Sequence, residues 1–342
     1  MPEMENSDLR SKGYDLLSIG DATIDVFMSP LESETICRID TKDCLISFPY
    51  GEKIPVKNLE FSIGGNAANN AIGTKRLGVS TGIVLTLGQD NVGEMIVKRL
   101  KDEMVDVTYV IGQPGTSSNY STIINYSGER TIFVYHAPRS YEFPVHLPSA
   151  PWVYLTSMGE SFGPFYIHMV DWLKANPQTK LAFNPGSWQM RSDPNYIKDV
   201  MSLTHVIFVN RQEAEKITGF GESSQKERDL LISLSKSGPK ICVITDGSKG
   251  SFAYDSVNGK FFKVGVLPVD AYERTGAGDA FGSGVLAALI HGKTLEEALL
   301  WGTSNSSSVI GYTGSQKGLL KLEEMDAWLT RAKSSGVEVT QF

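Results

Sequence analysis

Cysteine is scarce in this chain of 342 residues, which contains only Cys37, Cys44 and Cys242. Three cysteines give neither an even disulfide framework nor a Cys-x-x-Cys pair. Cys37 and Cys44 could approach each other, but we expect free thiols in a reduced compartment. The first 13 residues hold no apolar stretch of signal-peptide length, so a cytoplasmic protein is predicted.

The chain also lacks a long uncharged apolar run, and its mean hydropathy is −0.14, so no membrane-spanning helix is predicted. Basic residues are not in excess, because the net charge is −7, and this argues against nucleic acid as a partner. There is no G-x-x-x-x-G-K-[ST] loop, no H-E-x-x-H and no G-x-S-x-G, and the five histidines are scattered. The composition, 41% hydrophobic and 21% charged, is that of a globular protein.

Glycine, by contrast, is abundant, with 33 residues that fall mostly in short clusters. Such clusters indicate turns in which backbone approaches a ligand or another segment closely. Short apolar runs predict strands at 16–19, 83–87, 152–155, 181–183, 206–209 and 241–244, and helical patterns lie at 66–77, 91–103, 212–218, 280–290 and 295–301. Their alternation predicts an α/β fold with a parallel sheet, whose ligands bind at the carboxyl ends of the strands.

Two stretches interrupt this alternation, Ser33–Ser62 and Asn119–Tyr135. The second contains two extended runs joined by Ser127-Gly128, which is a hairpin signal. Both stretches lack helical patterns and could pair into a small separate sheet. A small sheet inserted in the N-terminal half of an α/β domain suggests a lid.

The segment Arg274-Thr275-Gly276-Ala277-Gly278-Asp279-Ala280-Phe281 is the most informative motif. Its glycines let backbone N–H groups converge at a helix N-terminus, where the helix dipole also favours an anion. Asp279 in the first turn fits a base that takes a proton from a hydroxyl while the N–H groups stabilise the attacked phosphate. Tight helix packing, or a dinucleotide fingerprint far from the first strand, are the alternatives.

Two further motifs suit the hydroxyls of an acceptor. Gly64-Gly65-Asn66-Ala67-Ala68-Asn69 brings backbone and amide groups to a helix start, although a capped helix after a Gly-Gly turn explains it too. In Gly20-Asp21-Ala22-Thr23-Ile24-Asp25, Asp25 could accept hydrogen bonds from two vicinal hydroxyls, whereas Asp21 could simply cap a helix.

Two motifs suit a nucleotide and its metal. Asn210 ends a predicted strand and Glu213 lies one helical turn further, so they could hold a water-coordinated Mg²⁺ near phosphates. A plain capping box is the alternative. Thr245-Asp246-Gly247-Ser248-Lys249-Gly250 follows a buried strand and could contact a nucleotide phosphate, or could form a strand-connecting turn.

In this order the five motifs resemble the ribokinase-like (PfkB) family of carbohydrate and nucleoside kinases, over roughly Tyr14–Leu320. The resemblance implies a three-layer α/β sandwich with a mainly parallel central sheet and a small inserted β-lid. It implies transfer of the γ-phosphoryl group of ATP to a hydroxyl of a sugar or sugar acid. The expected boundaries are a kinase domain at 14–330, lid segments at 31–62 and 116–138, and tails at 1–13 and 331–342.

The resemblance also implies roles for particular residues. Asp279 would be the catalytic base, with Gly276, Ala277 and Gly278 completing the anion hole. The acceptor would be bound by Asp25, Gly64, Gly65 and Asn69. ATP would be bound by Asn184, Asn210, Thr245, Gly247 and Gly250, and Glu213 would hold Mg²⁺ through water.

One segment departs from the family pattern. Many members read Asp-Thr-Thr or Asp-Thr-Asn before Gly-Ala-Gly-Asp, whereas this chain reads Glu273-Arg274-Thr275. In the family that Asp can help to bind a monovalent cation, so the departure argues against a K⁺ dependence, and Arg274 could partly substitute for the cation. The segment Ser33–Cys44 looks longer than a compact lid needs, so it could widen the acceptor pocket or contact another subunit. Exposed lid strands would favour a homodimer through the lid.

Two alternatives to a sugar kinase stay open. A nucleoside kinase of the same family would need an apolar shelf for the base, which the sequence does not single out. A non-catalytic sugar-binding protein of the same fold belongs to a different class, but such a protein would not need Asp279.

Overall fold

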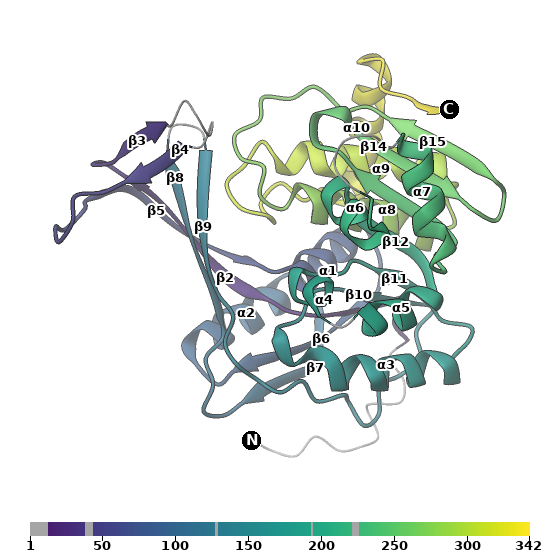
Figure 1. Cartoon of the computed structure of the whole chain (residues 1–342), viewed down its shortest axis with the longest axis horizontal. Helices are drawn as coiled ribbons and strands as arrows, with labels where there is room; N and C mark the ends of the chain where they lie inside the picture. The colour runs from purple at the N-terminus through teal and green to yellow at the C-terminus, as the bar shows by residue number, and fades with distance from the viewer. Residues whose placement is uncertain (1–12, 38–43, 127–128, 193, 221–225) are drawn as a thin grey trace.

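The computed structural model describes residues 13–342 except 38–43, 127–128, 193 and 221–225 (Figure 1). The strands are β1 (Leu16–Ile19), β2 (Thr23–Pro30), β3 (Glu34–Cys37), β4 (Cys44–Ser47), β5 (Val56–Gly64), β6 (Thr81–Gly88), β7 (Asp106–Gln113), β8 (Asn119–Tyr126), β9 (Glu129–Tyr135), β10 (Trp152–Leu155), β11 (Lys180–Phe183), β12 (Thr204–Asn210), β13 (Ile241–Thr245), β14 (Ser251–Asp255), β15 (Lys260–Val264) and β16 (Val339–Gln341). The α-helices are α1 (Asn66–Arg76), α2 (Asn91–Asp102), α3 (Gly163–Ala175), α4 (Ser187–Arg191), α5 (Pro194–Ser202), α6 (Arg211–Thr218), α7 (Glu227–Lys236), α8 (Ala277–Ile290), α9 (Leu295–Val309) and α10 (Leu322–Ser334).

The large sheet has ten strands in the order β16-β15-β14-β13-β12-β11-β10-β1-β6-β7. The seven strands from β13 to β7 run parallel, and β14, β15 and β16 extend the sheet in antiparallel pairing. The prediction of an α/β fold with a mainly parallel central sheet and a small separate sheet is confirmed.

Helices cover both faces of this sheet, as alternation along the strands requires. Leu17 and Ile19 of β1 join the core formed with α3, α5, α6 and α7. Leu16, which points to the opposite face, joins the core formed with α8, α9 and α10. A third core packs α1 and α2 against β6. The polar segments after the parallel strands therefore gather along one edge between two helical layers.

The lid is a separate four-stranded sheet in the order β5-β2-β8-β9, which extends away from the larger part of the molecule (Figure 1). β2 pairs with β5 in antiparallel and with β8 in parallel orientation, and β8 and β9 form the predicted hairpin. Its turn, Ser127-Gly128, lies outside the described residues. β2 begins at Thr23, so the lid sheet includes a strand that precedes the expected segment 31–62.

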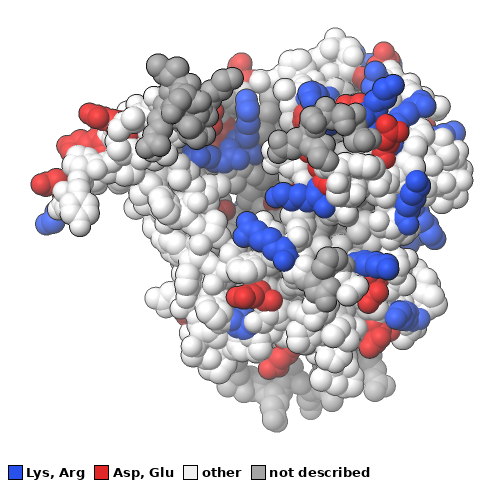
Figure 2. Space-filling view, in the orientation of Figure 1, with Lys and Arg blue, Asp and Glu red and all other residues white. Residues whose placement is uncertain are grey.

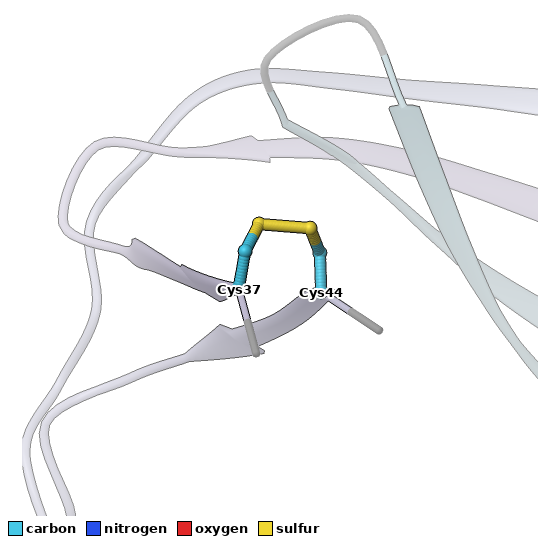
Figure 3. The surroundings of a disulfide bond; sticks show 2 residues. All are labelled: Cys37 and Cys44. Carbon is cyan, nitrogen blue, oxygen red and sulfur yellow. A yellow bond between two sulfur atoms is a disulfide. The ribbon is translucent and has the colours of Figure 1, made fainter. Parts of the chain in front are cut away.

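The prediction of free thiols at Cys37 and Cys44 is wrong. The two residues face each other across the antiparallel pair β3 and β4 and form a disulfide, with a Cα–Cα distance of 4.0 Å (Figure 3). The prediction relied on the compartment expected for the chain, whereas strand pairing brings these two side chains together. Cys242 is free and buried, and burial raises the pKa of its thiol.

The C-terminal residues differ from the expected tail at 331–342. α10 continues to Ser334, and β16 pairs with β15 at the edge of the large sheet.

α9 also runs past the expected 295–301 to Val309. Its second half contains small polar residues and lies close to α8: Nδ2 of Asn305 donates to the carbonyl oxygen of Ala280 at 2.8 Å. Close helix packing overrides the weak apolar periodicity of this segment.

The predicted N-terminal tail, 1–13, lies almost entirely outside the described residues. Among the helices that the structure describes, none combines the length and hydrophobicity needed to span a membrane.

Candidate active site

The large sheet and the lid enclose a cavity of about 240 Å³ between them. Three of the predicted motifs meet there, those that contain Asp25, Asn69 and Asp279. The cavity is lined by Asp21, Ala22, Thr23, Asp25, Gly65, Asn66, Asn69, Asn119, Ser121, Ile123, Ile132, Val134, His136, Ser157, Thr275, Gly276, Asp279 and Ser315. The set holds three carboxylates, several amides and hydroxyls, and no lysine or arginine, which suits a ligand rich in hydroxyl groups.

Asp279 lies in the first turn of α8 and reaches this cavity. Burial raises the pKa of its carboxyl to about 6, and a hydrogen bond from Asn69 opposes the rise. The Nδ2 of Asn69 donates to Oδ2 of Asp279 at 2.8 Å. A carboxylate whose pKa lies near 6 is ionised at neutral pH and still basic enough to accept a proton from a hydroxyl.

The amide of Asn69 is itself held in one orientation. Its Oδ1 accepts hydrogen bonds from the hydroxyl of Ser315 at 2.9 Å and from Nε2 of Gln316 at 3.0 Å. Because both donors face Oδ1, the Nδ2 of Asn69 must point toward Asp279. Gln316 is buried and anchored in turn, since its carbonyl oxygen accepts from Arg76 and its Oε1 accepts from Arg99.

Asp25 lies on β2, opposite the end of β5. Burial raises the pKa of its carboxyl to about 6, a hydrogen bond from Ser121 opposes the rise, and the carboxylates of Glu273 and Asp279 add to it. Gly64 is needed beside this carboxylate, because a Cβ there would come within 2.1 Å of Oδ2 of Asp25. Gly65 caps the N-terminus of α1.

Asp21, for which the sequence suggested only a helix-capping role, also lines the cavity. Both oxygens of its carboxylate accept from the hydroxyl of Tyr141 at 3.0 Å. Burial raises the pKa of Asp21 to about 6, and the guanidinium of Arg139 opposes the rise. The cavity therefore has a second buried carboxylate beside Asp25, fixed in place by a tyrosine.

The segment predicted to form the anion hole lies at the start of α8. Gly276 is its N-cap with φ of +77°, and a Cβ there would come within 2.3 Å of Ser315, so glycine is required. The N–H of Ala277 donates to the carbonyl oxygen of Arg274. The N–H groups of Gly278 and Asp279 belong to the first turn, where a helix offers no acceptor. These two N–H groups can bind an anion beside the carboxylate of Asp279.

The residues predicted to bind the nucleotide lie outside this cavity, at the neighbouring strand ends. Asn210 and Thr245 are paired at the ends of β12 and β13. Gly247 lies in a short 3₁₀ turn, and Gly250 follows it with φ of +87°. This segment therefore forms a turn that connects the antiparallel strands β13 and β14.

The capping box proposed as an alternative at α6 is also present. The Oδ1 of Asn210 accepts from the N–H of Glu213, and Oε2 of Glu213 accepts from the N–H of Asn210. Burial raises the pKa of Glu213, and the carboxylate of Asp279 adds to this effect. Asn184 binds within the protein, because its Nδ2 donates to the carbonyl of Phe208 and its Oδ1 accepts from Asn66.

Sequence reasoning missed the cavity residues that come from the lid and its neighbouring loops. Asn119, Ser121 and His136 are the polar members of this group. Partial burial lowers the pKa of His136, and the guanidinium of Arg139 adds to this effect. The extended run at Asn119–Tyr126 was predicted as a strand of a hairpin, but only its pairing with β2 indicates which face of that strand meets the cavity.

A buried carboxylate beside the unpaired N–H groups of a helix start, in a cavity lined by strands of the lid, is an arrangement that suits a phosphotransferase with a hydroxyl acceptor. The chain belongs to the pfkB family of carbohydrate kinases, because the sequence model of that family matches residues 19–322. The resemblance inferred from the motifs is thereby confirmed.

Among curated relatives, an ATP-dependent 6-phosphofructokinase of Thermoanaerobacterium thermosaccharolyticum is 26% identical, with 89% of this chain and 90% of the relative covered. A ribokinase of Haemophilus influenzae is 25% identical, with 85% and 96% covered. A cytidine kinase of Thermococcus kodakarensis is 27% identical, with 78% and 92% covered. Relatives of similar identity thus act on different acceptors.

Solved structures share the fold. The ribokinase of Arabidopsis thaliana, complexed with ribose and ATP, superposes with a TM-score of 0.76 at 20% identity and covers 93% of this chain and 99% of its own. A candidate ribokinase II of Escherichia coli in complex with ATP and Mg²⁺ gives a TM-score of 0.74 at 20% identity, with 93% and 99% covered. The fold is therefore ribokinase-like.

Proposed function

We propose that this kinase transfers the γ-phosphoryl group of ATP to a hydroxyl of a sugar or sugar acid, with Asp279 as the catalytic base. The observation that carries the proposal is the position of Asp279. It lies in the first turn of α8 and lines the cavity of about 240 Å³, which we call the acceptor cavity. Its Oδ2 accepts a hydrogen bond from Nδ2 of Asn69 at 2.8 Å. The carboxylate of Asp279 can thus take the proton of the acceptor hydroxyl while the N-terminus of α8 binds the transferred phosphoryl group.

In this proposal the acceptor lies in the cavity with its hydroxyls on Asp25 and Asp21. The carboxylate of Asp279 removes the proton of the reacting hydroxyl, whose oxygen attacks the γ-phosphorus. The N–H groups of Gly278 and Asp279 stabilise the charge on the transferred group, and ADP leaves. The lid strands β8 and β9 line the cavity and would exclude water during transfer.

ATP would lie along the ends of β12 and β13, near Asn210, Thr245, Gly247 and Gly250, with Asn184 nearby. Glu213 would hold Mg²⁺ through water. These residues fit a water-coordinated Mg²⁺, because the carboxylate of Asp279 lies close enough to raise the pKa of Glu213, and Mg²⁺ keeps several waters when few carboxylates are offered. Bound Mg²⁺ would neutralise charge on the phosphates.

A nucleoside acceptor is a second candidate, favoured by one observation. Ile123, Ile132 and Val134 form an apolar wall on the lid side of the cavity, which is the kind of shelf that a base needs.

ADP release with Mg-ATP across pentoses, hexoses, their phosphates, sugar acids and nucleosides tests these candidates. Strong turnover on a sugar or sugar acid supports the first proposal, and turnover confined to nucleosides supports the second. ATP binding without turnover on any of these compounds contradicts both.

We also propose a homodimer through the lid. β9 is an edge strand on which Phe133 is 57% exposed, so a second copy could pair with this strand and cover Phe133. Light scattering after size exclusion should give twice the monomer mass, and Phe133→Asp should give the monomer. A monomeric wild-type protein at high concentration would contradict this proposal.

A further inference from the structure

A second cavity, of about 490 Å³, lies at the distal end of the lid. Each strand of the lid sheet contributes to it, including Asn58 of β5, Ser29 of β2, Asn125 of β8 and Arg130 of β9. The loop Ala271–Arg274, which leads directly into the anion hole, forms the opposite wall. We call this cavity the distal groove.

The distal groove continues the face of the lid that forms the acceptor cavity. In register, Asp25 lies beside Ser121, and Ser121 lies opposite Val134, all three in the acceptor cavity. Four residues further along β2, Ser29 lies opposite Asn58. Because strand side chains alternate with a period of two, this pair shares the inner face with Asp25. The groove therefore begins about 13 Å from Asp25 along the strand.

The Asn125–Arg130 pair follows the same alternation on β8 and β9, two residues beyond Ile123 and Ile132 of the acceptor cavity. The chemistry of the inner face of the lid thus changes along the strands. A carboxylate at Asp25 is followed by an apolar band at Ile123 and Ile132, and then by the amides of Asn58 and Asn125 and the guanidinium of Arg130. A ligand that extends from the acceptor cavity along the lid meets these polar groups last.

Three cations from separate segments meet in the groove: Lys57, Arg130 and Arg274. All three are exposed, and within the described part of the chain no carboxylate lies within 4.0 Å of them. Figure 2 shows basic side chains around the hollow between the lid and the larger part of the molecule. By contrast, no lysine or arginine lines the acceptor cavity.

The two acidic residues of the groove do not cancel this charge at its centre. The carboxylate of Glu273 accepts hydrogen bonds from the backbone N–H groups of Thr275 and Gly314, so it is turned toward the main chain. Glu129 is exposed and also lines the groove, but its single carboxylate does not balance the three cations.

We propose that the distal groove binds the phosphate or carboxylate group of a small molecule, with Lys57, Arg130 and Arg274 as its ligands. Guanidinium groups suit such anions because they can bind two oxygens at once. Where the anion belongs to the acceptor, the inference rests on the proposed function and specifies an acceptor with a charged group remote from the reacting hydroxyl. Where it belongs to a separate compound, the groove is an effector site.

Calorimetric titration with inorganic phosphate at low ionic strength tests the groove without any need for turnover. The Lys57→Gln/Arg130→Gln double variant should bind phosphate about tenfold more weakly or lose one binding event, while the anion hole beside Asp279 keeps its own. Lys53→Gln is the matched control, because Lys53 is an exposed lysine that does not line the groove. Equal phosphate binding by the wild type and the double variant, or none by the wild type, would overturn the proposal.

Titration in the presence of the acceptor found by the ADP-release panel then distinguishes the two sources of the anion. Loss of groove binding when the acceptor is present assigns the groove to the acceptor, and persistence assigns it to an effector. If the panel yields no acceptor, the proposed function fails, but the titration of the double variant still decides whether the groove binds anions.

Discussion

The side-chain amide of Asn69 donates a hydrogen bond to the carboxylate of Asp279 at 2.8 Å, although the two residues lie 210 positions apart. The bond joins the start of α1 to the start of α8, and so joins the Gly-Gly-Asn motif to the Gly-Ala-Gly-Asp motif. It stabilises the ionised form of Asp279, which is the form that a catalytic base requires.

Removal of this bond should shift the pH dependence of the reaction. The pKa of Asp279 is about 6, so activity should fall as the pH drops through 6 and the base becomes protonated. Asn69→Ala removes a hydrogen bond that lowers this pKa, so the acid limb of the kcat profile should move to higher pH. Asn258→Ala, in an exposed turn, is the control. An acid limb that stays in place in Asn69→Ala would show that the bond does not set the pKa.

Gln316 should act through Asn69 as a positioning residue. Gln316→Leu removes one of the two donors that orient the amide, so kcat should fall and the acid limb should shift in the same direction as in Asn69→Ala. The two changes should be non-additive, because both act on one hydrogen bond. Independent, additive effects on kcat in the double variant would contradict this coupling.

Gly276 and Gly278 should respond differently to substitution. Gly276→Ala should lower the free energy of unfolding by about 1–3 kcal/mol, because its φ is +77° and its Cβ would meet Ser315 at 2.3 Å. Gly278→Ala should leave the melting temperature near that of the wild type, since nothing lies within 4 Å of an added Cβ. Thermal unfolding of both variants measures the difference, and equal destabilisation would contradict the assignment of the strained turn to Gly276.

The disulfide of the lid should be visible in a count of thiols. Denatured but unreduced protein should react with one equivalent of a thiol reagent, from Cys242, and reduced protein with three. Cys37→Ser should leave Cys44 free and raise the unreduced count to two. Three reactive thiols in air-exposed, unreduced wild-type protein would show that the lid cysteines are unpaired.

The parallel strands and the motifs at their ends could be predicted because each depends on local sequence. Runs such as Leu16–Ile19 are apolar on both faces, and the glycines before Asp279 mark a tight helix start. The contacts between distant segments could not be predicted in this way. The bond from Asn69 to Asp279, the tyrosine on Asp21 and the disulfide between β3 and β4 each depend on tertiary packing.

The boundaries of the lid could not be predicted from the sequence either. β2 continues from the acceptor motif into the lid, so no change of composition marks where one part ends. The small polar residues in the second half of α9 gave no apolar period, because the helix is defined by its close contact with α8.

The most direct test of the account compares Asp279→Asn with the wild type in ADP release on the best acceptor. The substitution keeps the shape of the side chain but removes the base, so kcat should fall by about 10²–10⁴-fold or more while ATP and the acceptor still bind. Turnover within about tenfold of the wild type, with binding intact, would contradict the assignment of Asp279 as the catalytic base.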